Sequence, residues 1–116
     1  MTTIDRYIEG FLAGQVVAYC EMVSCGVRLA GQLDVPAAAC ERLVSLVRRE
    51  GCQALIVSRG DPDRASVWIY REMGVERLIN ALDKITGPMP ADLAVWSMGK
   101  LFGYGDRNVL DYLAST

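Results

Sequence analysis

Residues 53–71 decide the fold, and they read QALIVS (53–58), RGDPDR (59–64), Ala65 and SVWIYR (66–71). The first run is short and apolar, and the last is rich in β-branched and aromatic residues, as strands are. Glycine, proline and aspartate between the two runs favour a turn. The stretch therefore predicts a β-hairpin. A rival interpretation makes Asp61 the cap of a helix that runs from Pro62 to Gly74.

Two helices are predicted before the hairpin. The second of them takes Asp34 as its N-cap and Pro36 in its first turn, and Gly51 follows its end as the C′ residue. The first runs from Thr3 to Gly31, because apolar residues recur every three or four positions. These residues are Ile4, Ile8, Phe11, Leu12, Val16, Tyr19, Cys20, Val23 and Val27.

Three shorter helices are predicted after the hairpin. An apolar stripe from Val75 to Ile85 marks the first, Pro90 begins the second, and Asp106 caps the third. We therefore expect one α+β domain over residues 1–116, rich in helix, with about five helices and one β-hairpin packed on a helical layer. If the rival helix formed instead of the hairpin, the fold would be an all-α bundle.

The composition excludes several classes of partner. Hydrophobic residues make up 52% of the chain and charged residues 22%, as in ordinary globular proteins. A net charge of −2 provides no basic surface, so no nucleic-acid partner is expected. The longest apolar run, residues 11–30, contains Gln15, Glu21 and Arg28, which favours a buried helix and no membrane partner. The start of the chain does not resemble a secretory signal, so we expect a cytoplasmic location and reduced cysteines.

The sequence offers little for catalysis. It contains no histidine, which excludes Ser-His-Asp and Cys-His nucleophile systems. Cys20, Cys25, Cys40 and Cys52 lack the close pairing typical of structural zinc sites, so we interpret them as small buried apolar residues. We predict no catalytic residue, no metal and no cofactor. Glu21 lies in an apolar helix, and we expect it to form a structural ion pair across a helix interface.

The second predicted strand carries the strongest candidates for a protein interface. Val67 and Ile69 lie on one face and Trp68 and Tyr70 on the other, because side chains alternate along a strand. If Val67 and Ile69 face the helices, Trp68 and Tyr70 face outward. Tryptophan, tyrosine and arginine are enriched at binding hot spots. The predicted interface therefore comprises Trp68, Tyr70 and the neighbouring Arg59, Arg64 and Arg71. In the alternative, Trp68 packs under the N-terminal helix.

Gly10 and Gly14 complete the predicted interface. They lie about one turn apart in the first helix, and each glycine costs about 1 kcal/mol relative to alanine in a helix interior. A packing role would account for that cost. We expect another backbone to approach closely there, either within the fold or from a second copy.

Three functional hypotheses follow. The first is a non-enzymatic protein–protein interaction module that binds itself or another protein and works as a homodimer. The second is an inhibitor from a phage or mobile element, of the anti-CRISPR kind, that blocks a host protein complex. The third is a small-ligand binder or an enzyme that uses carboxylate, tyrosine or cysteine side chains. A well-lined pocket near Glu21 or Tyr104 would favour the third.

Overall fold

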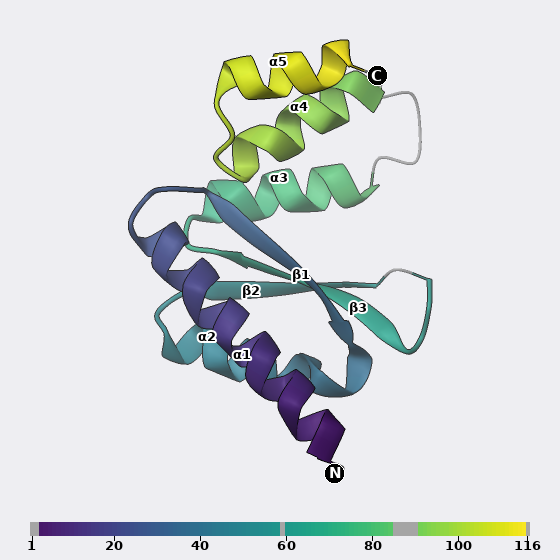
Figure 1. Cartoon of the computed structure of the whole chain (residues 1–116). Helices are drawn as coiled ribbons and strands as arrows, with labels where there is room; N and C mark the ends of the chain where they lie inside the picture. The colour runs from purple at the N-terminus through teal and green to yellow at the C-terminus, as the bar shows by residue number, and fades with distance from the viewer. Residues whose placement is uncertain (1–2, 59, 85–90, 116) are drawn as a thin grey trace.

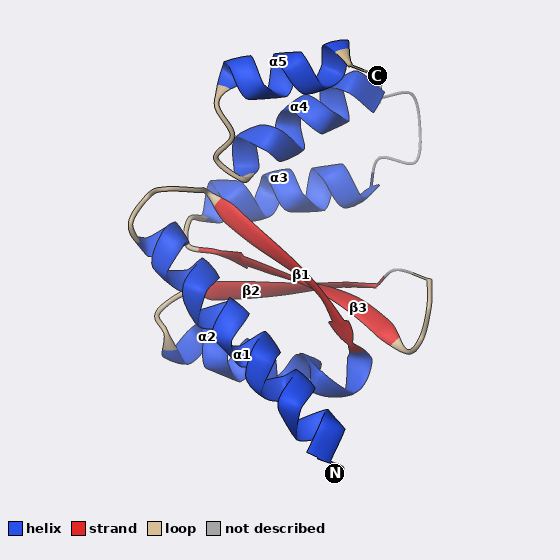
Figure 2. Cartoon of the chain, in the orientation of Figure 1, coloured by secondary structure: helices blue, strands red, loops and turns tan. Residues whose placement is uncertain are grey.

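The computed structural model describes residues 3–58, 60–84 and 91–115. Within these residues the chain forms five α-helices and a three-stranded antiparallel sheet (Figures 1 and 2), so the predicted α+β class is confirmed. The helices are α1 (Thr3–Ser24), α2 (Cys40–Arg49), α3 (Met73–Lys84), α4 (Ala91–Leu101) and α5 (Asp106–Ala114). The strands are β1 (Ala30–Pro36), β2 (Gln53–Ser58) and β3 (Arg64–Tyr70), and a short 3-10 helix (Ala37–Ala39) follows β1.

The predicted hairpin is confirmed as β2 and β3. The two strands pair antiparallel, with Leu55 opposite Trp68 and Ile56 opposite Val67. The turn between them includes Asp61, whose side-chain oxygen accepts a hydrogen bond from the backbone N–H of Asp63 at 2.9 Å. This is the local bonding by which aspartate favours turns. The rival helix from Pro62 to Gly74 is wrong, because β3 occupies most of that range.

Strand β1 corrects two predictions. The first helix ends at Ser24, not at Gly31, and Gly26 follows it with φ at +76°. Asp34 is not a helix cap, since it lies within β1 opposite Ser66 of β3. Pairing with β3 provides backbone hydrogen bonds along one edge of β1, and these outweigh the helical pattern of the sequence. The predicted C′ role of Gly51 is confirmed, since it follows the C-cap of α2 with φ at +85°.

The sheet has a hydrophobic core on each side. β3 is the central strand, with β1 on one edge and β2 on the other. Val67 and Ile69 pack in a core with α1 and α2, and both are fully buried. Trp68 and Tyr70 pack in a second core with residues of α3 and the end of α4. The helices therefore form two layers, with α1 and α2 on one side of the sheet and α3 on the other, and α4 and α5 lie beyond α3 (Figure 1).

The segment after α1 contacts both α1 and the end of α4. The guanidinium of Arg28 lies 4.7 Å from the ring centre of Tyr19 and 4.9 Å from that of Phe102. The backbone N–H of Leu29 donates to the carbonyl oxygen of Leu101 at 3.0 Å. These contacts fix the end of α4 against a segment more than 70 positions earlier in the chain.

Two expectations about α1 also change. Glu21 is exposed on its surface, so it needs no buried ion-pair partner. Residues 11–30 do not form one buried helix, because the helix gives way to β1. No helix in the described part of the chain combines the length and apolar character needed to cross a membrane.

Candidate functional site

Trp68 and Tyr70 are buried, so the expectation that they face outward is wrong. Each is 4% exposed. The Trp68 ring stacks on that of Phe102, with centroids 5.7 Å apart and an interplanar angle of 15°. Burial, with a smaller effect of the nearby Glu76, raises the pKa of Tyr70. The alternation along β3 was predicted correctly, but a second layer of helices covers the face that was expected to be open. The alternative that placed Trp68 under the N-terminal helix is also wrong.

The described arginines of the predicted interface, Arg64 and Arg71, do not form one surface patch. Arg59 lies outside the described residues. Arg64 begins β3 and Arg71 follows its end, so they are about 23 Å apart along the strand. One Arg64 nitrogen donates to the backbone oxygen of Asp34 at 3.1 Å and lies 3.5 Å from a carboxylate oxygen of Asp34. These contacts pair the Arg64 charge within the chain.

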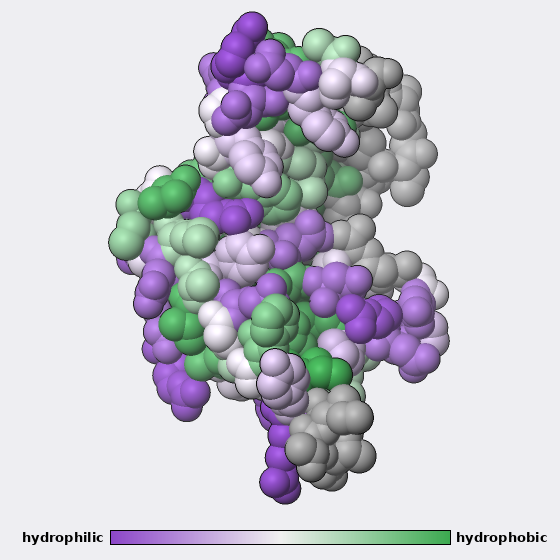
Figure 3. Space-filling model, viewed as in Figure 1, coloured by the Kyte–Doolittle hydropathy of each residue, from purple (hydrophilic) through white to green (hydrophobic). Residues whose placement is uncertain are grey.

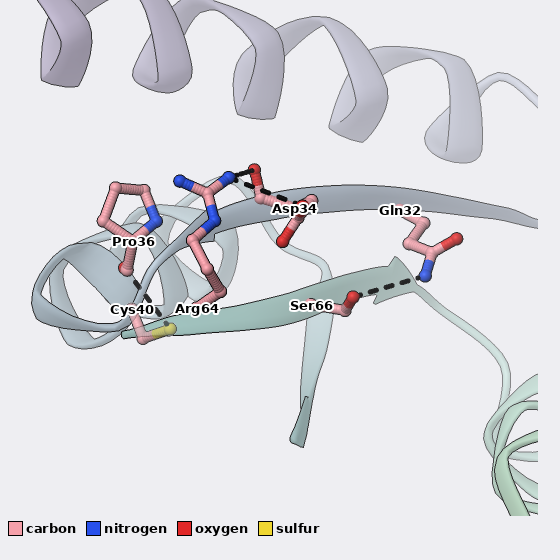
Figure 4. A network of polar contacts seen from close by, with 6 residues as sticks. All are labelled: Gln32, Asp34, Pro36, Cys40, Arg64 and Ser66. Carbon is pink, nitrogen blue, oxygen red and sulfur yellow. Dashed lines mark hydrogen bonds and ion pairs between the residues drawn. The ribbon is translucent and has the colours of Figure 1, made fainter. Parts of the chain in front are cut away.

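Arg64 borders a polar hollow on the same face of the sheet as Trp68. Figure 4 shows the Arg64–Asp34 contact beside a hydrogen bond of 3.4 Å from the Gln32 amide to the Ser66 hydroxyl. These four residues and Asp61 line the hollow, whose volume is about 560 Å³. The ionic and amide groups here already bond one another. The polar residues that line the hollow therefore form hydrogen bonds and an ion pair with one another.

Gly10 and Gly14 lie on an exposed face of α1. A Cβ built on either glycine would have no neighbouring atom within 4 Å, so nothing in the described chain uses the space they leave. Tyr7 and Phe11, at adjoining positions on the helix, are 79% and 62% exposed. Figure 3 shows hydrophobic surface along α1 and over the turn that follows it. Close approach within the fold does not explain these glycines, and contact with a second copy stays a prediction.

Replacing Gly10 or Gly14 with alanine is expected to raise the free energy of unfolding by about 1 kcal/mol per site. The methyl group meets no atom, while the unfolded chain loses conformational freedom. Urea unfolding followed by circular dichroism measures the change. Gly31→Ala is the control expected to destabilise, because its Cβ would lie 2.8 Å from the Tyr19 ring. Lower stability at Gly10 or Gly14 would show that these positions need glycine.

Three of the four cysteines are buried, as predicted, and Cys25 is exposed. The Cys52 thiol lies 3.8 Å from the backbone oxygen of Cys20 and 3.7 Å from the Ser24 hydroxyl. Burial, reinforced by the neighbouring Cys52, raises the pKa of Cys20 to about 12. Because the thiolate is the reactive form, Cys20 is a poor nucleophile. No metal-binding group of three or more suitable side chains occurs among the described residues.

A cavity of about 590 Å³ lies between α4 and α5 and includes Tyr104, the residue that sequence reasoning associated with a ligand pocket. Among the residues that the structure describes, its lining contains no charged residue. It consists of Ala94, Val95, Met98, Gly99, Phe102, Tyr104, Asn108, Val109 and Tyr112. Sequence reasoning missed the α5 residues, because only the turn after α4 brings them opposite Met98 and Phe102.

The outer edge of β2 is the second feature that sequence reasoning missed. Among the described residues β2 pairs with β3 and with no other strand, so its other edge has unpaired backbone groups. The strand reads QALIVS, without charge or proline, and Ile56 is 47% exposed. β1, the opposite edge, contains Asp34 and ends in Pro36. Charge and proline are common protections against strand addition, and β2 has neither.

Comparison of the chain with models of known protein families, with curated proteins and with solved structures found no match.

Proposed function

We propose that this chain is a non-enzymatic protein-interaction module that works as a homodimer, joined by antiparallel pairing of β2 with β2 of a second copy. The unprotected outer edge of β2 is the observation that carries this proposal. Unpaired N–H and C=O groups along an edge are a template for another strand. A second copy presents the same six residues and the same unpaired groups, so its edge is complementary by symmetry.

Twofold pairing of this kind also continues both cores. A twofold axis perpendicular to the sheet keeps α1 and α2 on the same side in both copies. Residues directly opposite each other in antiparallel strands share a face, so the pairing is centred on one residue that meets its own copy. Ile56 lies on the α1/α2 side, opposite Val67, and Leu55 lies on the α3 side, opposite Trp68. Either centre places an apolar pair at the axis.

Light scattering coupled to size-exclusion chromatography tests the proposal. We expect wild type to have twice the chain mass and to dissociate on dilution. Ile56→Lys is expected to be a monomer at every concentration, because lysine on an edge strand opposes strand addition. Met73→Lys is the matched control, since Met73 is 75% exposed, begins α3 and is not a residue of β2. A monomeric wild type, or a dimeric Ile56→Lys variant, would contradict the proposal.

Cysteine substitutions test the register of the pairing. In a Cys25→Ser background, which removes the exposed thiol, Ile56→Cys or Leu55→Cys is expected to give a disulfide-linked dimer under mild oxidation. The variant that cross-links identifies the residue at the axis. Failure of both variants to cross-link in a dimeric protein would exclude pairing centred on Ile56 or Leu55, and α1 with Gly10 and Gly14 would be tested next as the dimer surface.

A further inference from the structure

The cavity between α4 and α5 is built by fixed contacts. A Cβ on Gly99 would lie 2.7 Å from a methyl carbon of Val109, so the two helices meet at this glycine without space for a side chain. Val109 is 4% exposed. Because the floor of the cavity is already in tight contact, the helices cannot move together there to fill the space.

The turn between the helices holds the cavity open. The backbone N–H of Tyr104 donates to the Gly99 oxygen at 2.9 Å, and that of Val109 donates to the Gly105 oxygen at 3.1 Å. An ion pair between Lys100 and Asp106 spans the same turn. These contacts set the direction of α5 relative to α4. The cavity is therefore largely formed before any ligand arrives, as small-molecule sites usually are.

The chemistry of the lining defines its occupant. None of the nine lining residues is charged, and apolar side chains such as Val95, Met98 and Phe102 provide most of the wall. Three lining residues carry polar ends, namely Tyr104, Asn108 and Tyr112, and all three are exposed, so they stand at the rim. An ionised group would lose hydration inside such a cavity and find no counter-charge among the described lining residues.

We propose that the α4–α5 cavity binds a small, uncharged, mostly apolar molecule that carries one hydrogen-bonding group, such as a medium-chain alcohol or a substituted phenol. The apolar part occupies the space over Val109 and Met98. The hydroxyl meets the Asn108 amide or a tyrosine hydroxyl at the rim. The volume of about 590 Å³ lies within the usual range for small-molecule sites, which is about 300–1,000 Å³. This site does not depend on the proposed β2 dimer.

A fluorescence titration with N-phenyl-1-naphthylamine, an uncharged probe that brightens in apolar surroundings, tests the proposal. We expect saturable binding of one probe per chain. 1-Decanol is expected to displace it at about tenfold lower concentration than decanoate, since the carboxylate must be desolvated to enter. The monomeric Ile56→Lys variant is expected to bind the probe as wild type does, which separates this test from that of the dimer.

Two variants and a control locate the binding. Ala94→Phe fills the cavity and is expected to weaken probe binding about tenfold or more. Asn108→Asp adds a charge at the rim with almost no change of size, and it is expected to weaken the binding of decanol. The variant is expected to keep α5 folded, because an acidic residue suits the first turn of a helix. Ala114→Phe, at the end of α5 and outside the lining, is the control expected to bind as wild type.

Three results would overturn the proposal. The first is an absence of saturable probe binding to wild type. The second is unchanged affinity in an Ala94→Phe variant whose circular dichroism is native, together with unchanged decanol affinity in Asn108→Asp. The third is equal competition by decanol and decanoate, which would show that the probe reports general surface adsorption.

Discussion

Replacing Trp68 with alanine is expected to lower the free energy of unfolding by about 3–5 kcal/mol. The side chain is 4% exposed, lies in the middle of the central strand and stacks on Phe102 of the C-terminal half. Its removal leaves a cavity between the sheet and the helices that cover it. Small domains have a total stability of about 5–15 kcal/mol, so this loss is a large fraction. Guanidinium unfolding followed by circular dichroism measures it.

Two variants sharpen this experiment. Trp68→Phe keeps an aromatic ring in the stack and is expected to recover much of the lost stability. Trp96→Ala, at a partly buried position on α4, is the matched control and is expected to cost less. The outward-facing interpretation of the sequence makes the opposite prediction. A Trp68→Ala variant with wild-type stability and weakened self-association would support that interpretation and contradict the buried position.

Replacing Gly103 with alanine is expected to cost about 2–4 kcal/mol, because dihedral strain and steric overlap act together. Gly103 has φ at +82°, in the left-handed region that disfavours side chains. A Cβ there would also overlap the carbonyl oxygen of Val27 and lie 3.2 Å from the Cβ of Arg28. Neither neighbour is the flexible end of a side chain. The segment after α1 must therefore move away from the end of α4.

Gly51→Ala separates the two causes. Gly51 also lies two residues beyond its helix, with φ at +85°, but a Cβ there would have no atom within 4 Å. It is expected to show the dihedral cost alone, about 1–2 kcal/mol. Urea unfolding of both variants gives the difference, and near-ultraviolet circular dichroism reports the Trp68 environment. Equal costs for Gly51→Ala and Gly103→Ala would show that the Val27 contact is not a fixed part of the fold.

Local sequence was sufficient where neighbouring residues decide the structure. The run at 53–58, the Asp61 turn and the run at 66–71 predicted a hairpin because each has the residues its own backbone needs. Gly51 marked the end of α2 for the same reason. The alternation of Val67 and Ile69 against Trp68 and Tyr70 also followed, since the period of two is a property of any strand.

Tertiary structure decided what depends on distant residues. Residues 30–36 became β1 because β3 offers backbone hydrogen bonds along its whole length. Their partner residues lie 28 to 40 positions further along the chain, so the local sequence does not reveal them. Trp68 is buried because a second layer of helices covers it, which alternation alone does not reveal. The open edge of β2 and the cavity between α4 and α5 also depend on how the elements are arranged in space. Sequence by itself determined which elements form and which residues share a face, and only the three-dimensional arrangement determined which faces and edges stay free to bind.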